Sequence, residues 1–399
     1  MSQQSSDTTD APLGALVFAS SYTALGIVRS LGRHGIPVWV LGERFSLSGV
    51  SRYAKRTLRL EGRDEAEQVE FLLRLARQHQ LKGWAIFPDS DKSVALIGRN
   101  QQALGEYYKL TSPSWDVAEW AFDKKRTYQL AEELKIDYPK TFYPISRAQV
   151  EKIDGAFPMI LKPANHQGSD RFSIISGAWR ADDRAELLSL YDQASEAVGN
   201  RPIITVQEMI PGGGEAQFSY TALCDRGRVL ACVFAQRKRL LPVDFGASAY
   251  VVTIPDIPEM EDASRRWLER VQYTGLVEVE FKYHAGTGHY KLLDVNARAW
   301  GWHVLCRFAG VDYPYLMWKL VQGEPVEPVR GRAGVRWMRT AYDAMSALQL
   351  IRRGTLSVSD YLESIRGAHQ DVFMLDDLMP AVFEVPLLFK LVWNKFRGR

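Results

Sequence analysis

The stretch of residues 275–302, GLVEVEFKYHAGTGHYKLLDVNARAWGW, restricts the fold more than any other part of this chain. Apolar and polar residues alternate on both sides of a turn that contains Gly286 and Gly288. A period of two indicates β-strands, and a glycine-containing connection between two such strands indicates a hairpin. We therefore expect a hairpin with one apolar face and one polar face.

The polar face of this hairpin collects groups that can bind a cation. Glu278 and Glu280 share it in the first strand. Asp294, Asn296 and Arg298 share one face of the second strand by the same period. Hard oxygen ligands of this kind suit Mg²⁺ with substrate phosphates, and an adjacent arginine suits a transferring phosphoryl group. The alternative is a solvated face whose acids and arginine pair with one another.

Upstream, the apolar strand 157–163 carries Lys162 close to its end. An ammonium at that position can place a point charge on phosphate oxygens. The polar loop 164–172 follows, with Gly168 and Ser169, and could cover a triphosphate. The alternative for Lys162 is that it only caps the end of a strand.

A second upstream segment is the apolar strand 204–210, which ends near an acid and continues into a glycine-rich bend. Such a strand end could offer backbone groups to an adenine edge, and Glu215, just past the bend, could accept ribose hydroxyls. A plain turn is the alternative. The residues expected near adenine are Gln207, Glu208, Met209 and Ile210.

The third upstream feature is the pair Asp123-Lys124, in a helix predicted from about Val117 to Leu134. Lys124 could reach phosphate, and a surface pair on a helix is the alternative. All three features precede the acidic hairpin in a workable order, which favours a nucleotide site over separate coincidences.

The first lobe is predicted to contain a parallel sheet. Strand 15–19, helix 24–34 and strand 36–41 form a βαβ unit, and helix 66–79 continues the pattern. The first turn holds only Gly26 where a dinucleotide site needs three glycines, so a capped turn is favoured over a nicotinamide site. A substrate anion at that helix N-terminus is a further alternative.

In this order the motifs resemble those of the ATP-grasp superfamily, within which the chain looks most similar to carboxylate–amine ligases related to D-aspartate ligase. The resemblance covers roughly residues 115–310, and the lobe before it resembles the domain that precedes ATP-grasp in this family. The closing acid-x-Asn-x-Arg motif is the most specific element. The motifs are Asp123-Lys124, Ile160-Leu161-Lys162-Pro163, Gln207-Glu208-Met209-Ile210, Glu278-Val279-Glu280-Phe281 and Leu293-Asp294-Val295-Asn296-Ala297-Arg298.

For the nucleotide, the resemblance implies that Lys124 and Lys162 hold the phosphates of ATP. It also implies that Glu208 and the backbone of Ile210 contact adenine. Glu215 would contact ribose.

For the metal, the resemblance implies that Glu280, Asp294 and Asn296 bind Mg²⁺, with Mn²⁺ as an alternative. Arg298 would contact the phosphates or an acyl phosphate. Two positions depart from the family: Asp294 stands where glutamate is usual, and the covering loop has the single glycine Gly168. Both departures leave room for reduced or altered activity.

The activity that the resemblance implies is an ATP-dependent ligation. A carboxylate is phosphorylated to an acyl phosphate, and an amine attacks it and releases phosphate. Some such enzymes act in polysaccharide or cell-envelope assembly. Arg237 is a candidate contact for phosphate or substrate, with Lys238 and Arg239 equally available. The alternatives are an ATP-grasp kinase and a non-catalytic nucleotide-binding regulator at the membrane surface.

Composition argues against several other classes of protein. A formal net charge of +3 over 399 residues gives no support for nucleic-acid binding. Three cysteines without CxxC spacing indicate reduced thiols in a cytoplasmic protein and no zinc site. We expect packing roles for the cysteines and structural roles for His166 and His303.

The expected fold is α/β in the first lobe and α+β beyond it, in an ATP-grasp architecture. The expected parts are a flexible tail without signal-peptide character (1–12), an N-terminal α/β domain (13–115), an ATP-grasp domain (116–330) and a C-terminal helical extension (331–399).

The last residues, 379–399, combine apolar, aromatic and basic side chains. A helix after Pro386 would place Lys390, Asn394 and Arg397 on one side, with apolar residues opposite or beside them. About ten residues cannot span a bilayer but suit an interfacial helix at the inner face of the membrane. A terminal helix docked on the protein body is the alternative.

Overall fold

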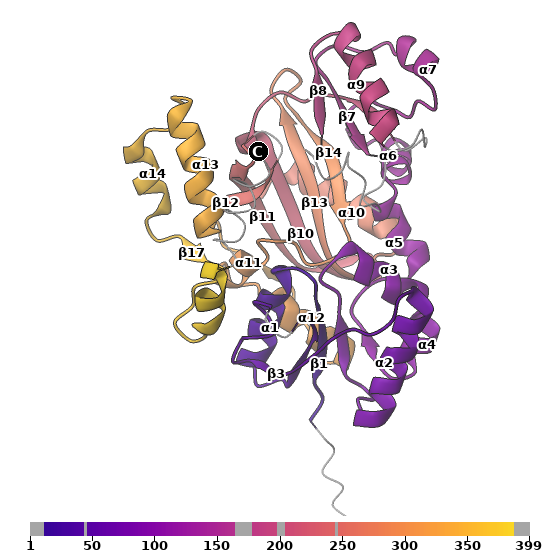
Figure 1. Ribbon diagram of the computed structural model, residues 1–399, viewed down its shortest axis with the longest axis vertical. Coiled ribbons are helices and arrows are strands. Elements are labelled where there is room, and N and C mark those ends of the chain that lie inside the picture. Colours follow the sequence, from indigo (N-terminus) through magenta and orange to yellow (C-terminus); the bar gives the residue numbers. More distant parts are fainter. Residues whose placement is uncertain (1–11, 44–45, 164–177, 198–203, 244–245, 387–399) are drawn as a thin grey trace, which may run out of the picture. The chain divides into compact units, whose positions relative to one another are not determined.

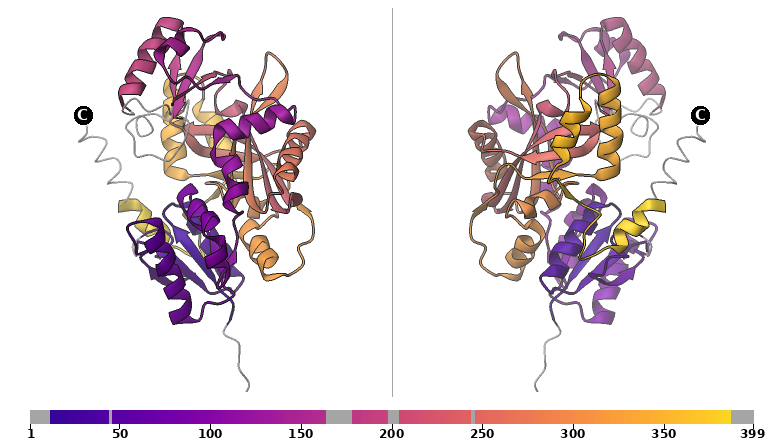
Figure 2. Two further views of the ribbon diagram at one scale, coloured as in Figure 1. Left: turned by 90° about the vertical axis from the view of Figure 1, so that its right-hand side faces the viewer. Right: turned by 90° about the vertical axis from the view of Figure 1, so that its left-hand side faces the viewer.

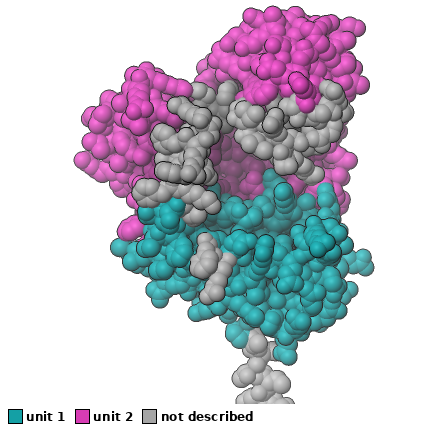
Figure 3. All heavy atoms as spheres, viewed as in Figure 1, with its two compact units in different colours: residues 1–111, 314–325, 375–399 teal, residues 112–313, 326–374 magenta. Residues whose placement is uncertain are grey.

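The computed structural model describes residues 12–43, 46–163, 178–197, 204–243 and 246–386. The chain forms two compact units (Figure 3). Unit 1 comprises residues 1–111, 314–325 and 375–399, and unit 2 comprises residues 112–313 and 326–374. The first boundary lies close to the expected one, whereas the expected C-terminal extension is divided between the two units.

Unit 1 is built on a parallel sheet with the strand order β3-β2-β1-β4-β5 (Figure 1). β1 and β2 pair in parallel, with Ala15 opposite Val38 and Ala19 opposite Gly42, and α1 connects them in the sequence. This confirms the predicted βαβ unit. The strands are β1 (Ala15–Ala19), β2 (Val38–Gly42), β3 (Ala54–Leu58), β4 (Ala85–Phe87) and β5 (Lys109–Leu110). The helices are α1 (Thr23–Arg33), α2 (Glu65–His79), α3 (Asp91–Arg99) and α4 (Gln101–Gly105), with most of α12 (Tyr313–Gln322).

The turn between β1 and α1 binds a carboxylate of the protein itself. The Asp89 side chain accepts hydrogen bonds from Ser20 Oγ at 3.0 Å and from the Ser21 backbone N–H at 2.6 Å. Asp89 is buried. The anion at this helix N-terminus is therefore internal, which agrees with a structural turn and not with a substrate site there.

Residues 375–386 return to unit 1 and are held there by acids. Asp377 accepts hydrogen bonds from Arg29 Nε at 2.8 Å and Ser51 Oγ at 2.6 Å. The neighbouring Asp376 pairs with Arg33 at 2.7 Å. Residues 379–386, which follow, are helical.

Unit 2 contains a small antiparallel sheet with the order β6-β9-β7-β8. Helices α7 and α9 pack against each other, and α9 packs on the sheet strands. The elements are β6 (Thr141–Phe142), α7 (Arg147–Glu151), β7 (Met159–Pro163), β8 (Trp179–Ala181), α9 (Arg184–Ala197) and β9 (Ile204–Glu208).

The larger part of unit 2 is an eight-stranded sheet with the order β14-β13-β10-β11-β12-β16-β17, in which β15 pairs with β11. Its long strands pair antiparallel, as predicted. The strands are β10 (Gln217–Asp225), β11 (Arg228–Leu241), β12 (Ala247–Thr253), β13 (Gly275–His284), β14 (His289–Asn296), β15 (Val329–Arg330), β16 (Arg336–Met338) and β17 (His369–Gln370). The 3₁₀ turn η1 (Gly214–Ala216) leads into β10, and α11 (Val304–Phe308) follows β14.

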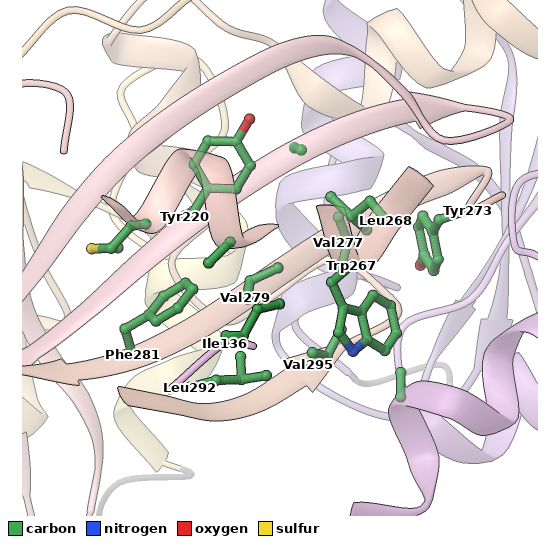
Figure 4. Close-up of a cluster of buried hydrophobic side chains, with 14 of the residues drawn as sticks. Ile136, Tyr220, Trp267, Leu268, Tyr273, Val277, Val279, Phe281, Leu292 and Val295 are labelled. Atoms are coloured by element: carbon green, nitrogen blue, oxygen red, sulfur yellow. The ribbon is translucent and has the colours of Figure 1, made fainter. Parts of the chain in front are cut away.

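One face of the large sheet carries the core of unit 2 (Figure 4). Val277, Val279 and Phe281 of β13 lie in it, as their alternation predicts, beside Tyr220 of β10. Trp267 of α10 (Pro258–Arg270) covers them. Burying each such side chain contributes roughly 1.5–3 kcal/mol, so this face is strongly fixed. The residues between them on β13 must then point to the opposite face.

The helix predicted from 117 to 134 is in fact two helices, α5 (Trp115–Phe122) and α6 (Lys124–Glu133). The backbone is extended at Asp123, whose side chain accepts a hydrogen bond from the Lys125 N–H at 2.9 Å. Aspartate at such a position caps a new helix, and the prediction of one continuous helix is wrong for this reason. Lys124 becomes the first residue of α6.

Helices α13 (Thr340–Arg352) and α14 (Val358–Ile365) lie side by side in the C-terminal part of unit 2 (Figures 1 and 2). Arg239 of β11 ties both to the large sheet. Its guanidinium bonds Asp343 of α13 at 2.6 Å and Ser364 of α14 at 2.9 Å. Arg239 therefore has a structural role. Of the three candidate contacts for phosphate or substrate, Arg237 and Lys238 remain.

Candidate active site

The polar face of the β13–β14 hairpin gathers the three predicted metal ligands. Glu280 lies opposite Asp294 in the antiparallel ladder, and Glu278 lies opposite Asn296. Directly opposed side chains are roughly 5 Å apart at their Cβ atoms. The Asn296 Nδ2 donates to Glu280 at 2.8 Å and to Glu278 at 3.2 Å. Three carboxylates and an amide thus lie together on one side of the sheet.

Arg237 of β11 neutralises the two glutamates of this face. Its Nη2 lies 2.6 Å from Glu280 Oε1 and 3.3 Å from Glu278 Oε1. Its Nη1 donates to Gln217 Oε1 at 3.1 Å. Burial lowers the pKa of Arg237, but the charges of Glu280 and Glu278 outweigh burial and raise it above its ordinary value. Arg237 therefore stays charged and holds both acids in place.

Glu278 is the buried member of the acidic pair. Its Oε1 accepts a hydrogen bond from Ser219 Oγ at 2.9 Å. Burial raises the pKa of Glu278, and the charge of Glu280 raises it further, against the opposing effect of Arg237. This environment suits a group that orients its neighbours, while Glu280 and Asp294 are the more exposed acids.

Lys124 faces the same site from α6. Its Nζ lies 2.6 Å from Asp294 Oδ2, and the two side chains are only 13% and 25% exposed. One turn further along α6, the Tyr128 hydroxyl donates to the Leu293 carbonyl at 2.8 Å and docks the helix on β14. The alternative of a surface pair between Asp123 and Lys124 is therefore not what the structure shows.

Lys162 approaches from the small sheet. Its Nζ donates to Gln207 Oε1 at 3.1 Å, and Gln207 Nε2 in turn donates to Tyr128 OH at 3.1 Å. Burial lowers the pKa of Lys162, the positive charge of Lys124 also lowers it, and the negative charge of Asp294 raises it, so that the pKa is about 8. Lys162 is thus within electrostatic range of the acidic hairpin.

At the strand end predicted to contact adenine, some polar groups already bind other residues of the protein. Glu208 forms an ion pair with Lys291 of β14, so its carboxylate is neutralised. The backbone N–H of Met209 bonds the Pro158 carbonyl at 3.1 Å. Glu215 Oε1 accepts the Gly213 N–H at 2.8 Å and shapes the glycine-rich bend.

Arg298 is not placed by strand alternation, because β14 ends at Asn296. Its Nη1 donates to the Ala299 carbonyl at 3.3 Å, and its charge still lowers the pKa of Glu278. Gly168, Ser169 and His166 lie outside the described residues. His303 is buried, its Nδ1 lies 2.8 Å from the Trp300 carbonyl, and burial lowers its pKa to about 4.

Sequence reasoning missed Lys282 and Lys291 on the same hairpin. Lys282 could have been found, because the period of two that relates Glu278 to Glu280 leads directly to it. Lys291 gave no local signal, since its partner Glu208 lies 83 residues away.

The donor set fits Mg²⁺ only with help from a ligand. No group of three or more His, Cys, Asp or Glu side chains is placed to hold a metal in the part of the chain that the structure describes. Two carboxylates and an amide oxygen could hold Mg²⁺ together with substrate phosphates and water, which is the usual Mg²⁺ environment at nucleotide sites.

The small antiparallel sheet and the large, mainly antiparallel sheet of unit 2, with acids on the large sheet and lysines beside them, form an ATP-grasp fold. Residues 202–341 match the family described as "ATP-grasp in the biosynthetic pathway with Ter operon".

Over part of its length the chain is similar to a ligase. The D-aspartate ligase of Enterococcus faecium (strain Aus0004) is 27% identical over 242 residues, which are 58% of this chain and 57% of that enzyme. The chain thus matches little more than half the length of this relative.

Two solved structures share the fold. The L-amino acid ligase from Bacillus licheniformis aligns with a TM-score of 0.59 and 16% identity, over 80% of this chain and 76% of that chain. The biotin carboxylase domain of Hydrogenobacter thermophilus 2-oxoglutarate carboxylase, solved with MgADP, ADP and bicarbonate, aligns with a TM-score of 0.63 and 14% identity, over 82% and 74% of the chains.

Proposed function

We propose that this protein uses Mg·ATP to activate a carboxylate as an acyl phosphate and joins it to an amine. The observation that carries the proposal is the convergence of Glu280, Asp294 and Asn296 with Lys124 and Lys162 in range of one another. The similarity to a D-aspartate ligase and to the fold of an L-amino acid ligase supports an amino acid as one substrate.

Each residue of the site has a separate task in this reaction. Glu280, Asp294 and the Asn296 carbonyl oxygen would hold Mg²⁺, which when bound supplies positive charge against the transferring phosphoryl group. Lys124 and Lys162 would hold phosphate oxygens and keep the chain of ATP in line with the carboxylate.

Arg237 contacts Glu278 and Glu280 on this face, and the charge of Arg298 reaches Glu278. Arg237 positions Glu280, and Arg298 is the candidate for direct contact with the acyl phosphate. Amide formation through an acyl phosphate needs no nucleophile from the enzyme. Burial raises the pKa of all three cysteine thiols, which keeps them protonated and agrees with packing roles.

Phosphate release with pooled amino acids and uronic acids as carboxylates, with and without amines, tests the proposal. We expect release of ADP and phosphate that requires both a carboxylate and an amine. Asp294→Ala, checked for folding by circular dichroism, is the blank. Release that needs no amine would point to a kinase instead. Tight Mg·ATP binding with no turnover for any pair would favour a regulator.

We also propose that the C-terminal residues contact an anionic membrane surface. Met379, Val382 and Val385 of the helix 379–386 are exposed, Val382 to 60%, and the helical period places them on one face. Leu378, directly before the helix, is also exposed. A solvent-facing apolar stripe on a helix that the protein body already holds calls for a further partner.

The sequence beyond this helix supports a lipid partner. In the sequence, apolar residues recur at Phe389, Val392 and Phe396, and residues 387–399 contain four basic residues and no acid. Apolar residues flanked by lysine and arginine suit the surface of an anionic bilayer. No helix among the described residues is long and apolar enough to cross a membrane. Such a location would suit a substrate from envelope or polysaccharide assembly.

Flotation with vesicles of phosphatidylcholine, with and without phosphatidylglycerol, tests the membrane contact. The full chain is expected to float with the anionic vesicles, and a form truncated after Leu378 is expected to remain in the bottom fraction without vesicles. Val382→Glu should weaken flotation strongly, whereas Leu362→Glu, at an equally exposed leucine of α14, should not. Equal behaviour of the full and truncated chains would dismiss the contact.

A further inference from the structure

Lys282 lies on β13 two residues beyond Glu280, and its partner on β10 is Gln217. Ser219, two residues along β10, is the partner of Glu280. Because side chains alternate along a strand, Lys282 projects from the same polar face as Glu280. A further lysine therefore lies on the face that carries the candidate metal ligands, two residues beyond Glu280 along β13.

The Lys282 side chain is buried without a counter-charge in contact. The residue is 8% exposed and makes no hydrogen bond or ion pair with any other residue that the structure describes. Nearly all buried lysines are paired, because an ammonium taken out of water loses its hydration. Lys282 therefore has no carboxylate in contact among the described residues, and an anion bound beside it would supply the missing partner.

Lys282 lies beside residues of the candidate nucleotide site. Glu215, the predicted ribose contact, precedes by two residues Gln217, which is the β10 partner of Lys282. Lys282 in turn acts on Lys162, the predicted phosphate contact, which Lys124 also repels. Lys162 is thus repelled by two other ammonium groups, and a polyanion would relieve that repulsion.

We infer that Lys282 binds the phosphate nearest the ribose of a nucleoside di- or triphosphate, as a third lysine beside Lys124 and Lys162. The inference rests on the proposed binding of Mg·ATP in this site. The pairing of Lys282 with Gln217, two residues after the predicted ribose contact Glu215, favours the end of the phosphate chain nearest the ribose.

The test is Lys282→Met, which keeps the apolar stem and removes the charge. Binding of ATP, ADP and adenosine in the presence of Mg²⁺ is measured by calorimetry, and the melting temperature is measured without ligand. ATP and ADP should each bind about 10- to 100-fold more weakly, and adenosine should bind as before. The ligand-free melting temperature should not fall, because the substitution breaks no hydrogen bond or ion pair with a residue that the structure describes.

Two further variants sharpen the result. Lys282→Arg should recover most of the affinity for ATP, and Lys109→Met, at an exposed lysine of β5, should change nothing. Wild-type affinity in Lys282→Met, or weaker binding of adenosine to the same extent as ATP, would overturn the inference while leaving the proposed function standing. A wild-type protein that binds no Mg·ATP would overturn both.

Discussion

The Lys124 ammonium lies 2.6 Å from Asp294 Oδ2, although the two residues are 170 positions apart in the sequence. A lysine predicted to hold phosphate therefore neutralises, in the ligand-free protein, an acid predicted to hold the metal. Binding of Mg·ATP would exchange these partners: Asp294 would gain the metal, and Lys124 would gain phosphate oxygens. The ion pair keeps the acid from standing uncompensated before the nucleotide arrives.

This exchange predicts that Lys124→Met changes two affinities in opposite directions. Mn²⁺ alone should bind several-fold more tightly, because Asp294 no longer has a competing cation. ATP should bind about tenfold more weakly, because one phosphate contact is lost. Both are measured by titration, Mn²⁺ by its electron paramagnetic resonance signal. Lys125→Met, at the exposed neighbouring position, is the control. If both affinities fell together, Lys124 would be holding α6 in place and not competing for Asp294.

Arg237→Met should destabilise unit 2. The change leaves Glu278 and Glu280 close together without the guanidinium that neutralises both, and breaking a buried ion pair on one side costs roughly 3–5 kcal/mol. Urea unfolding followed by tryptophan fluorescence should show a lower midpoint. The double variant Arg237→Met with Glu280→Gln should recover part of the loss, since one of the two charges is gone. A single variant as stable as the wild type would contradict the assigned role of Arg237.

Much of the hairpin and of the first lobe could be predicted because their signals are local. The alternation from Val277 to Phe281 fixes which face is buried, and the opposite face then carries Glu278 and Glu280 without further information. The βαβ unit likewise follows from an apolar strand, a helix and a glycine stop within residues 15–42.

The rest of the site depends on contacts that no local pattern encodes. The pairing of Lys124 with Asp294 and of Glu208 with Lys291 joins different elements through tertiary packing. The break at Asp123 was missed because a capping aspartate inside an amphipathic run competes with helix continuation, and only the packed structure decides between them. The return of Asp377 to Arg29 spans 348 residues and could not be foreseen from either segment.

The low pKa of Lys162, about 8 against an ordinary value of 10.5, predicts a pH-dependent ATP affinity. Above pH 8 the free protein holds Lys162 neutral, and bound phosphate favours the ammonium, so binding must take up a proton. ATP affinity should therefore fall as pH rises through 8. Calorimetry on both sides of pH 8, in buffers with different ionisation enthalpies, measures the uptake directly.

The lowered pKa of Lys162 also determines how the stability of the ligand-free protein changes with pH. Because the folded-state pKa lies below the unfolded one, the unfolded chain holds more protons between pH 8 and 10.5, and this group makes the ligand-free fold more stable as pH rises through that window. The variant Lys162→Arg tests the assignment to Lys162, because arginine stays charged throughout this pH range. In this variant, ATP binding should no longer take up a proton. Proton uptake of equal size in Lys162→Arg would assign it to another group.

Asp377→Ala should destabilise unit 1 by roughly 3–5 kcal/mol, because it leaves the Arg29 guanidinium buried without its carboxylate. The side chains of both partners are 1% exposed, and Asp377 also accepts hydrogen bonds from Ser51 Oγ and the Arg52 N–H. The matched control is Glu61→Ala, which breaks the exposed pair with Arg74 and should cost roughly 0–1 kcal/mol. Thermal unfolding of both variants measures the difference in stability.

Since Asp377 precedes the helix 379–386, the loss of its carboxylate should also expose that segment to proteolysis, whereas Glu61→Ala should not. Equal melting temperatures for the two variants would mean that the ion pair does not hold the C-terminal segment on unit 1.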